Sequence, residues 1–194
     1  MGRRPRYDRE AMISAALELV AEGGPQTATV SAIAQRVGAP TGSFYHRFRS
    51  RELLLAELWL TVVETSQKAF LAELEHDDPL EAGLRAAVFW PRWVRAHLLE
   101  ARLLLLHHRR DFVPDAWPEE LVERANALEP ALMAGVRDLC VRHYGADDEE
   151  ALRRVRFALL DVPYGSLRSY VQAGRSPPAQ LDELITEACR AVLA

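Results

Sequence analysis

The side chains best suited to chemistry lie close together near the N-terminus of this chain, between residues 29 and 51. They carry hydroxyl, imidazole and guanidinium groups, which donate hydrogen bonds to phosphate oxygens and to the edges of bases. These residues are Thr29, Thr41, Ser43, Tyr45, His46, Arg47 and Arg51. Recognition of a polyanion is the chemistry that this stretch predicts.

Two short helices joined by a tight turn are predicted to position these groups. Val30, Ile33 and Val37 recur at the spacing of one helical face, and Gly38 ends that helix. A second helical pattern covers residues 40–48. We therefore expect a helix-turn-helix whose second helix enters the major groove of DNA.

The second helix is predicted to have an apolar inner side and a polar outer side. Phe44 and Phe48 are four residues apart and should pack inward, which leaves the adjacent Tyr45 and His46 exposed. Gly42 lies near the start of this helix, where a side chain would keep the backbone away from DNA. Glycine costs about 1 kcal/mol in a helix relative to alanine, so its presence favours a role in close approach.

The charge of the chain is unevenly divided. The formal net charge is −4, but residues 1–51 contain eight arginines and four acidic residues, a net +4 that leaves −8 for the rest. This division indicates a basic head that meets phosphate and an acidic body that does not. Four arginines, at positions 3, 4, 6 and 9, precede or open the first helix, either as an arm along the DNA or as an unstructured tail.

Composition excludes several classes of protein. A hydrophobic content of 49% in 194 residues is enough for a proper core. No apolar run approaches the roughly 20 residues of a spanning helix, and no signal peptide is recognisable, so we expect a cytosolic protein without a membrane partner. Cys140 and Cys189 are expected to be reduced, buried thiols, and no cofactor or metal is predicted. A metal site at His107, His108 and Asp111 is disfavoured, because adjacent histidines diverge on a helix.

The two-helix motif resembles the DNA-binding domain of the TetR/AcrR family of transcriptional regulators. The shared pattern is Thr-Val, two residues, Ile-Ala, two residues, Val-Gly, then Gly42, Phe44-Tyr45, Phe48 and a basic residue before Glu52-Leu53. The resemblance covers about residues 8–60. It implies an all-α fold, with a helix-turn-helix DNA-binding domain over residues 1–50 and a larger helical ligand-binding and dimerisation domain over residues 51–194.

The resemblance also implies a function. Members of the family are mostly homodimeric repressors that bind a palindromic double-stranded DNA operator and are released by a small-molecule effector. In this sequence the positions that the family uses for phosphate or base contact are Thr29, Thr41, Gly42, Tyr45, His46 and Arg51, with Ser43 and Arg47 also available. Pro40 stands where the family commonly has a hydroxyl residue, and its nitrogen cannot donate, so the usual contact at that position is in doubt.

Large side chains gather in the predicted body near two prolines. Pro91 is expected to kink or end a helix over residues 80–97, and Pro163 beside Tyr164 is a second place where a helix can open space for a ligand. We expect a cavity for a partly apolar effector, with ordinary core packing as the alternative for each residue. The candidate lining residues are Phe89, Trp90, Trp93, Leu103, His107, Trp117, Tyr164 and Arg168, with Arg168 as an anchor for an anionic group or as part of an exposed ion pair.

Longer helices are predicted to join head and body and to pair two copies. A helix from residue 51 to about 76 spans both parts and is the expected lever between them. Polar residues before the predicted helices serve as N-caps, namely Asp8, Thr29, Ser50 and Asp147 or Asp148. The last two helices, ending near residues 173 and 192, carry apolar stripes suited to a dimer interface or to core packing.

Two other classes of function remain as alternatives. One is a small hydrolase on the same fold that uses Ser166 or a histidine, although the sequence has no nucleophile elbow and no phosphate-binding glycine loop. The other is a helical interaction module whose head does not bind DNA. A DNA-binding regulator that is not an enzyme is the prediction that the sequence favours.

Overall fold

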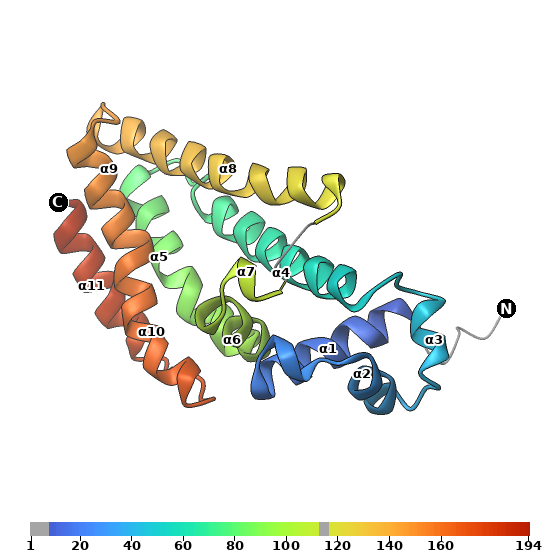
Figure 1. Cartoon of the computed structure of the whole chain (residues 1–194). Coiled ribbons are helices and arrows are strands. Elements are labelled where there is room, and N and C mark those ends of the chain that lie inside the picture. The colour runs from blue at the N-terminus through green and yellow to red at the C-terminus, as the bar shows by residue number, and fades with distance from the viewer. Residues whose placement is uncertain (1–7, 113–116) are drawn as a thin grey trace, which may run out of the picture.

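The computed structural model describes residues 8–112 and 117–194, and these residues form helices and no strands (Figure 1). This confirms the predicted all-α class. The head is a small group at the N-terminal end, made of α1 (Arg9–Gly23), the short turn η1 (Pro25–Thr27), α2 (Val30–Val37) and α3 (Gly42–Tyr45). The helix α4 (Arg51–Glu73) leads from the head into the body, as the sequence predicted.

The body consists of the remaining helices. They are α5 (Pro79–Ala96), α6 (Leu98–Leu106), α7 (Arg109–Phe112), α8 (Glu119–Tyr144), α9 (Glu149–Arg156), the π-helical turn η2 (Phe157–Asp161), α10 (Val162–Gln172) and α11 (Leu181–Leu193). α4 packs against α8 and α5, and α5 in turn packs against α10 and α11. α6 lies where head and body meet, because it packs against both α1 and α10 (Figure 1).

Polar caps begin the helices at the positions predicted from sequence. The side chain of Asp8 accepts a hydrogen bond from the backbone N–H of Ala11, and Thr29 and Ser50 cap α2 and α4 in the same way. Asp148, rather than Asp147, caps α9. Each cap satisfies one of the backbone N–H groups that a helix start leaves unpaired.

Two predictions about helix length are wrong. The α-helical part of the second head helix covers only Gly42–Tyr45, with turns on either side in place of a helix over residues 40–48. Pro91 does not end its helix, since α5 continues through it to Ala96. Pro91 removes one backbone hydrogen bond, but it is buried, as are Val88 and Val94, and the helix continues on both sides of it. The alternative of a kink at Pro91 remains a prediction.

The second proline in the body coincides with a widened helical turn. The N–H of Val162 donates to the carbonyl of Phe157, five residues back, and Pro163 has no N–H to give to Ala158. The thiol of Cys189 donates to this Ala158 carbonyl instead, at 2.8 Å. Cys140 and Cys189 are both buried, as predicted, and burial raises the pKa of Cys189 to about 11.

The apolar core does not stop where the head ends. One cluster of buried side chains combines Met12 and Phe44 of the head with Leu55 of α4, Leu103 of α6 and Leu121 of α8. A second cluster fills the body between α4, α5, α8, α9 and α11. The boundary at residue 50 remains a prediction, but packing joins the head to α4, α6 and α8.

Candidate nucleic-acid interface and body cavity

The segment around α3 has the two sides predicted for a recognition helix. Phe44 and Phe48 are 0% and 3% exposed and lie tilted against each other with ring centroids 5.6 Å apart. Tyr45, between them in sequence, is 61% exposed. Its neighbours His46 and Arg47 are exposed as well. The buried phenylalanines therefore fix the orientation of polar side chains that point away from the head.

The turn before α3 leaves its backbone open to close approach. Gly38 has a φ of 71°, a left-handed conformation that glycine adopts without strain, and it ends α2. A Cβ atom at Gly42 would meet nothing within 4 Å. Packing within the chain therefore does not require glycine at position 42, and its predicted role in contact with DNA remains a prediction.

The other hydroxyl residues are also accessible. The Thr29 hydroxyl accepts from the N–H of Ala32 at 3.1 Å, yet the residue is exposed and its own O–H remains able to donate. Thr41 is exposed and Ser43 is half-buried. The N-termini of α2 and α3 thus present hydroxyl groups on the outer side of the head, and their phosphate contacts stay a prediction.

Arg51 has a role that sequence reasoning missed. Its Nε donates to the carbonyl of Ala28 at 2.8 Å, and its Nη2 donates to the carbonyl of Pro25. Nη1 lies 3.7 Å from a carboxylate oxygen of Glu52. The side chain thus fastens the start of α4 to the turn before α2. A phosphate contact by Arg51 stays a prediction. The guanidinium would have to make this contact in addition to the hydrogen bonds that it already donates within the chain.

Other arginines of the head are engaged in ion pairs. Arg36 binds Glu18 at 2.9 Å and Glu22 at 2.8 Å, which joins α2 to α1 and holds the pKa of Glu22 below its usual value. Arg9 pairs with Glu57 and lies over the ring of Phe48, so it helps to hold the head on α4.

Other basic side chains of the head are available to an outside partner. Arg47 and Arg49 are exposed and make no ion pair within the part of the chain that the structure describes. The three arginines at positions 3, 4 and 6 lie outside the described residues. Among the described arginines of the head, these two are the best placed to meet phosphate.

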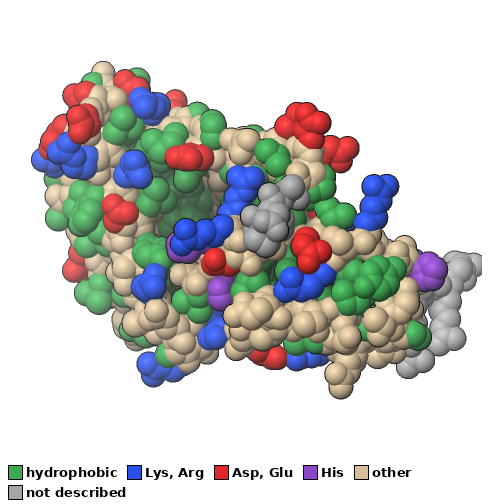
Figure 2. Space-filling model, viewed as in Figure 1, with side chains coloured by type: hydrophobic (Ala, Val, Ile, Leu, Met, Phe, Trp, Pro, Cys, Tyr) green, Lys and Arg blue, Asp and Glu red, His purple; other side chains and the backbone are tan. Residues whose placement is uncertain are grey.

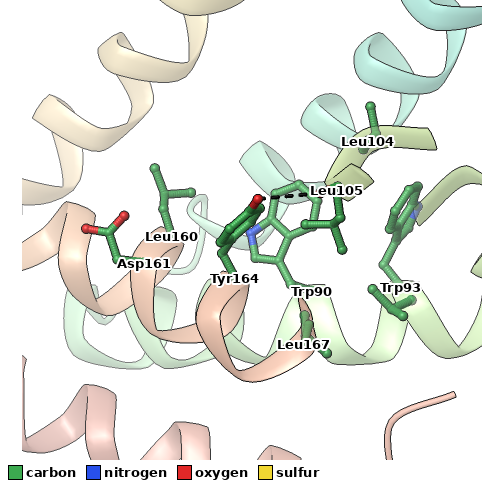
Figure 3. A pocket seen from close by; sticks show the side chains of 9 residues that line it. Trp90, Trp93, Leu104, Leu105, Leu160, Asp161, Tyr164 and Leu167 are labelled. Atoms are coloured by element: carbon green, nitrogen blue, oxygen red, sulfur yellow. Dashed lines mark hydrogen bonds between the residues drawn. The ribbon is translucent and has the colours of Figure 1, made fainter. Parts of the chain in front are cut away.

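The body contains a mostly apolar cavity of about 280 Å³ between α5, α6, η2 and α10. Figure 3 shows side chains from these elements converging on it. Its lining consists of Trp90, Trp93, Val94, Leu104, Leu105, Leu160, Asp161, Tyr164 and Leu167. Three of the predicted ligand residues, Trp90, Trp93 and Tyr164, are brought together here. The space-filling view of Figure 2 also shows a hollow lined with hydrophobic side chains in the body, with Lys or Arg side chains beside it.

Three other predicted ligand residues do not line this cavity. Leu103 is fully buried in the cluster that joins head and body. Phe89 packs edge-on against Phe70, with ring centroids 6.0 Å apart. Trp117 packs edge-on against Trp59 at the same centroid distance. These three residues therefore pack against other side chains, which is the alternative to cavity lining that the sequence left open.

His107 and Arg168 lie near the cavity elements without lining the cavity. His107 follows α6 and packs edge-on against Phe112, and burial lowers its pKa. Arg168 donates from Nη1 to the hydroxyl of Tyr164 at 2.6 Å. Arg168 thus binds the side chain of Tyr164, which lines the cavity, and among the described residues it does not form the exposed ion pair that the sequence suggested as an alternative.

Most of the remaining lining residues were missed because they are aliphatic. Val94, Leu104, Leu160 and similar residues have no sequence signal that separates a cavity wall from a core. Asp161 had one signal, its position beside Pro163.

Three lining residues carry a polar side-chain group, namely Asp161, Tyr164 and Trp90. In Figure 3 the Asp161 carboxylate lies beyond Leu160 and points away from Tyr164 and Trp90. Trp90 Nε1 is buried and has no hydrogen-bond partner among the described residues. The cavity thus offers a ligand apolar walls together with a few polar contacts.

The structure supplies no arrangement for the hydrolase alternative at Ser166. Its hydroxyl donates to the carbonyl of Val162, one turn earlier, at 2.7 Å. Within residues 8–112 and 117–194, no three His, Cys, Asp or Glu side chains are grouped as metal ligands, and no helix is long and apolar enough to span a membrane.

Comparison with known proteins agrees with the geometry of the head. The family model described as bacterial regulatory proteins, tetR family, matches residues 12–58. A probable acrEF/envCD operon repressor of Escherichia coli K12 is 26% identical over 141 residues, which are 68% of this chain. The match spans 61% of the length of that repressor.

Solved structures share the fold over nearly the whole chain. PfmR, a TetR-family transcriptional regulator of Thermus thermophilus, has a TM-score of 0.71 at 22% identity, covering 96% of this chain and 97% of PfmR. FadR of Bacillus subtilis in complex with stearoyl-CoA has a TM-score of 0.68 at 16% identity, covering 95% and 99%. This chain is thus similar to TetR-family proteins in the sequence of its head and in its fold over nearly the whole length.

Proposed function

We propose that this TetR/AcrR-family regulator is a repressor that binds a palindromic operator as a homodimer and leaves it when a small molecule enters the body cavity. The observation that carries the proposal is the two-sided α3 segment. Buried Phe44 and Phe48 hold Tyr45 and His46 outward, within the residues that match the family model.

The proposed DNA contacts follow from the exposed groups of the head. The hydroxyls of Tyr45, Thr41 and Thr29 donate to phosphate, and His46 donates to phosphate or a base edge. Gly42 lets the backbone approach. The basic residues Arg47 and Arg51, with Ser43, complete the proposed set. Because α3 is short, the turns that flank it belong to the reading surface as much as the helix does.

Exposed apolar side chains near the C-terminus support a dimer. Phe157 in η2 is 48% exposed and Leu184 in α11 is 62% exposed, and these two elements pack together. Other apolar residues of the last helices, Val155, Leu159, Leu167 and Ile185, are buried within the chain and serve its own core. A two-fold pair through the exposed residues would place recognition helices about 34–36 Å apart, in successive major grooves.

α6 offers a route from the cavity to the head, in addition to the lever α4. Leu104 and Leu105 of α6 line the cavity. Arg102, on the same helix, donates from Nε to the carbonyl of Ala21 at 2.7 Å and from Nη1 to the carbonyl of Val171 at 3.2 Å. A ligand that displaces α6 would therefore shift α1. A coupling of about 1–3 kcal/mol, typical of allostery, changes operator affinity about 5- to 150-fold.

Selection of bound fragments from the source genome is the experiment that tests this function. The expected result is a set of fragments sharing a palindrome, with an affinity that falls as salt rises. The selected operator is then used in a mobility shift with Tyr45→Phe, which removes one exposed hydroxyl and is expected to weaken binding with the fold intact.

Tyr170→Phe is the matched control for that variant, because Tyr170 lies in α10, outside the residues that match the family model. It is expected to bind the operator as the unmodified protein does. Equal operator affinity for Tyr45→Phe would remove its hydroxyl from the contact set. Absence of salt-dependent binding to any fragment would refute the regulator and favour the interaction module.

A further inference from the structure

The body cavity has a more specific chemistry than apolar walls alone. Seven of its nine lining residues are Trp, Val or Leu, which favours a largely apolar ligand. Trp90 also places its indole Nε1 at a buried position without a hydrogen-bond partner among the described residues. A buried N–H left unpaired is unfavourable, so a ligand that accepts from it gains more than one that does not.

Neighbouring rings fix the orientation of that indole. Trp90 stacks on Phe70 with ring centroids 5.5 Å apart, and Phe89 and Trp93 meet it edge-on at 5.1 and 6.0 Å. In Figure 3 the nitrogen lies on the edge of the ring that faces the side of Tyr164 and Leu160. Because the ring is held on three sides, the N–H cannot turn away to find another acceptor without breaking this packing.

The other polar groups on the wall are less available than Trp90. The Tyr164 hydroxyl already accepts from Arg168 at 2.6 Å and points to the carbonyl of Leu105 at 3.5 Å. Asp161 is exposed, so its carboxylate is solvated by water and contributes little to holding a cation. The same solvation gives it little repulsion for an anion, but an anion must give up its own hydration to enter walls that are largely apolar. A cation would leave the indole N–H unpaired.

We infer that the cavity takes an uncharged, largely apolar molecule whose single polar group contains a hydrogen-bond acceptor, a carbonyl or hydroxyl oxygen, and that Trp90 Nε1 donates to it. A hydroxyl oxygen suits the site as a carbonyl oxygen does, because either can accept from Trp90. This inference rests on the proposed function in treating the cavity as the effector site, and it makes Trp90 the residue that sets effector specificity.

Probes that share one skeleton test the inference directly. Methyl naphthyl ketone, isopropenylnaphthalene, naphthylethylammonium and naphthoate are similar in shape and differ in their polar group. Binding of each to the full chain, without DNA, is measured by calorimetry. The ketone is expected to bind about 2- to 13-fold more tightly than the isopropenyl compound, the range for one net hydrogen bond, and more tightly than either charged probe.

The variant Trp90→Phe removes the N–H and keeps an aromatic ring. It is expected to bind ketone and hydrocarbon equally, with the affinity for the hydrocarbon close to that of the unmodified protein. Trp59→Phe is the matched control, because Trp59 packs against Trp117 and does not line the cavity. In this control the preference for the ketone is expected to persist.

A second measurement keeps the inference testable if Trp90→Phe fails to fold. The chain has four tryptophans, and their indole N–H resonances can be followed in the unmodified protein labelled with nitrogen-15. The ketone is expected to shift one of them downfield, as a new hydrogen bond does, whereas the hydrocarbon is expected not to.

Several outcomes overturn the inference. They are equal binding of ketone and hydrocarbon to the unmodified protein, a ketone preference that survives in Trp90→Phe, tightest binding of a charged probe, and no binding of any probe. None of them bears on DNA binding, which is measured separately. Absence of salt-dependent operator binding would refute the proposed regulator function. It would not affect the inference about which ligand the cavity binds.

Discussion

Two aromatic helices of this protein, α3 in the head and α5 in the body, show the same kind of sequence and different outcomes. In α3, the side chains of Phe44 and Tyr45 separate cleanly into a fully buried one and a largely exposed one. In α5, Phe89 and Trp90 are both half-buried, one packed into the core and the other lining a cavity. Helical spacing decides the roles in α3 and does not decide them in α5.

The difference comes from the number of surfaces around each helix. Within residues 8–112 and 117–194, α3 has the small core of the head on one side and no packed helix over its outer face. A period of 3.6 residues therefore sorts its side chains into two classes. α5 packs against α4, α6, α8, α10 and α11. Side chains around most of its circumference meet other helices, and which contacts close completely depends on residues far away in sequence.

The largest expected effect separates the two faces of α3. Phe44→Ala is expected to cost about 3–5 kcal/mol of unfolding free energy, because it empties a fully buried site, and to abolish operator binding. Tyr45→Ala removes an exposed side chain and is expected to change stability by less than about 0.5 kcal/mol while it weakens operator binding. Chemical denaturation and a mobility shift on both variants make the measurement. Similar losses of stability in the two would mean that α3 is not two-sided.

The next comparison lies inside the π-helical turn of the body. Leu159 is fully buried and its neighbour Leu160 lines the cavity. Leu159→Ala is expected to cost about 2–5 kcal/mol of unfolding free energy. Leu160→Ala is expected to cost clearly less, because one side of this leucine already lacks packed neighbours. Urea unfolding of both variants measures the difference, and a larger cost for Leu160→Ala would contradict the assignment of core and cavity wall.

Two arginines of the head sharpen the comparison between holding the fold and meeting DNA. Arg51→Ala is expected to cost about 1–3 kcal/mol of stability, because the carbonyls of Ala28 and Pro25 lose a charged donor. Arg47→Ala is expected to change the free energy of unfolding by less than about 0.5 kcal/mol. It is expected to reduce the slope of operator affinity against salt concentration by about one unit, the contribution of one phosphate contact.

Thermal unfolding and operator titrations at several salt concentrations distinguish the two arginines. A lower salt slope for Arg51→Ala as well would confirm that its side chain contacts phosphate in addition to the turn. An unchanged slope for Arg47→Ala would remove Arg47 from the phosphate contacts.

The smallest expected effect concerns pH. Burial lowers the pKa of His107 in the folded protein. The unfolded chain, in which the histidine pKa is about 6.5, therefore takes up the proton at a higher pH than the folded protein does. Stability is therefore expected to fall as pH drops through that value, because protonation favours the unfolded chain. His107→Gln should reduce this loss. Unfolding curves across the range, with His108→Gln as a control on the same turn, test the prediction, and an unaltered pH profile in His107→Gln would count against it.

The sequence by itself determined the organisation of the head and the order of the helices. Val30, Ile33, Phe44 and Phe48 have a period that places them inside, and Asp8, Thr29 and Ser50 begin helices because a cap is a contact between residues three positions apart. Such local relations depend on few residues, and these can be read in order. The resemblance to a known family rested on the same local pattern.

Tertiary structure alone decided the length of α3, the continuity of α5 through Pro91, the inward contacts of Arg51 and the division of the body aromatics. Arg51 donates to carbonyls more than twenty residues away, and Leu104, Leu160 and Trp90 form one wall from three separate elements. The sequence does not encode such distances as a repeat. Burial in a helix with several neighbours is a property of the whole packing, so a core side chain and a cavity wall look alike until the helices are in place.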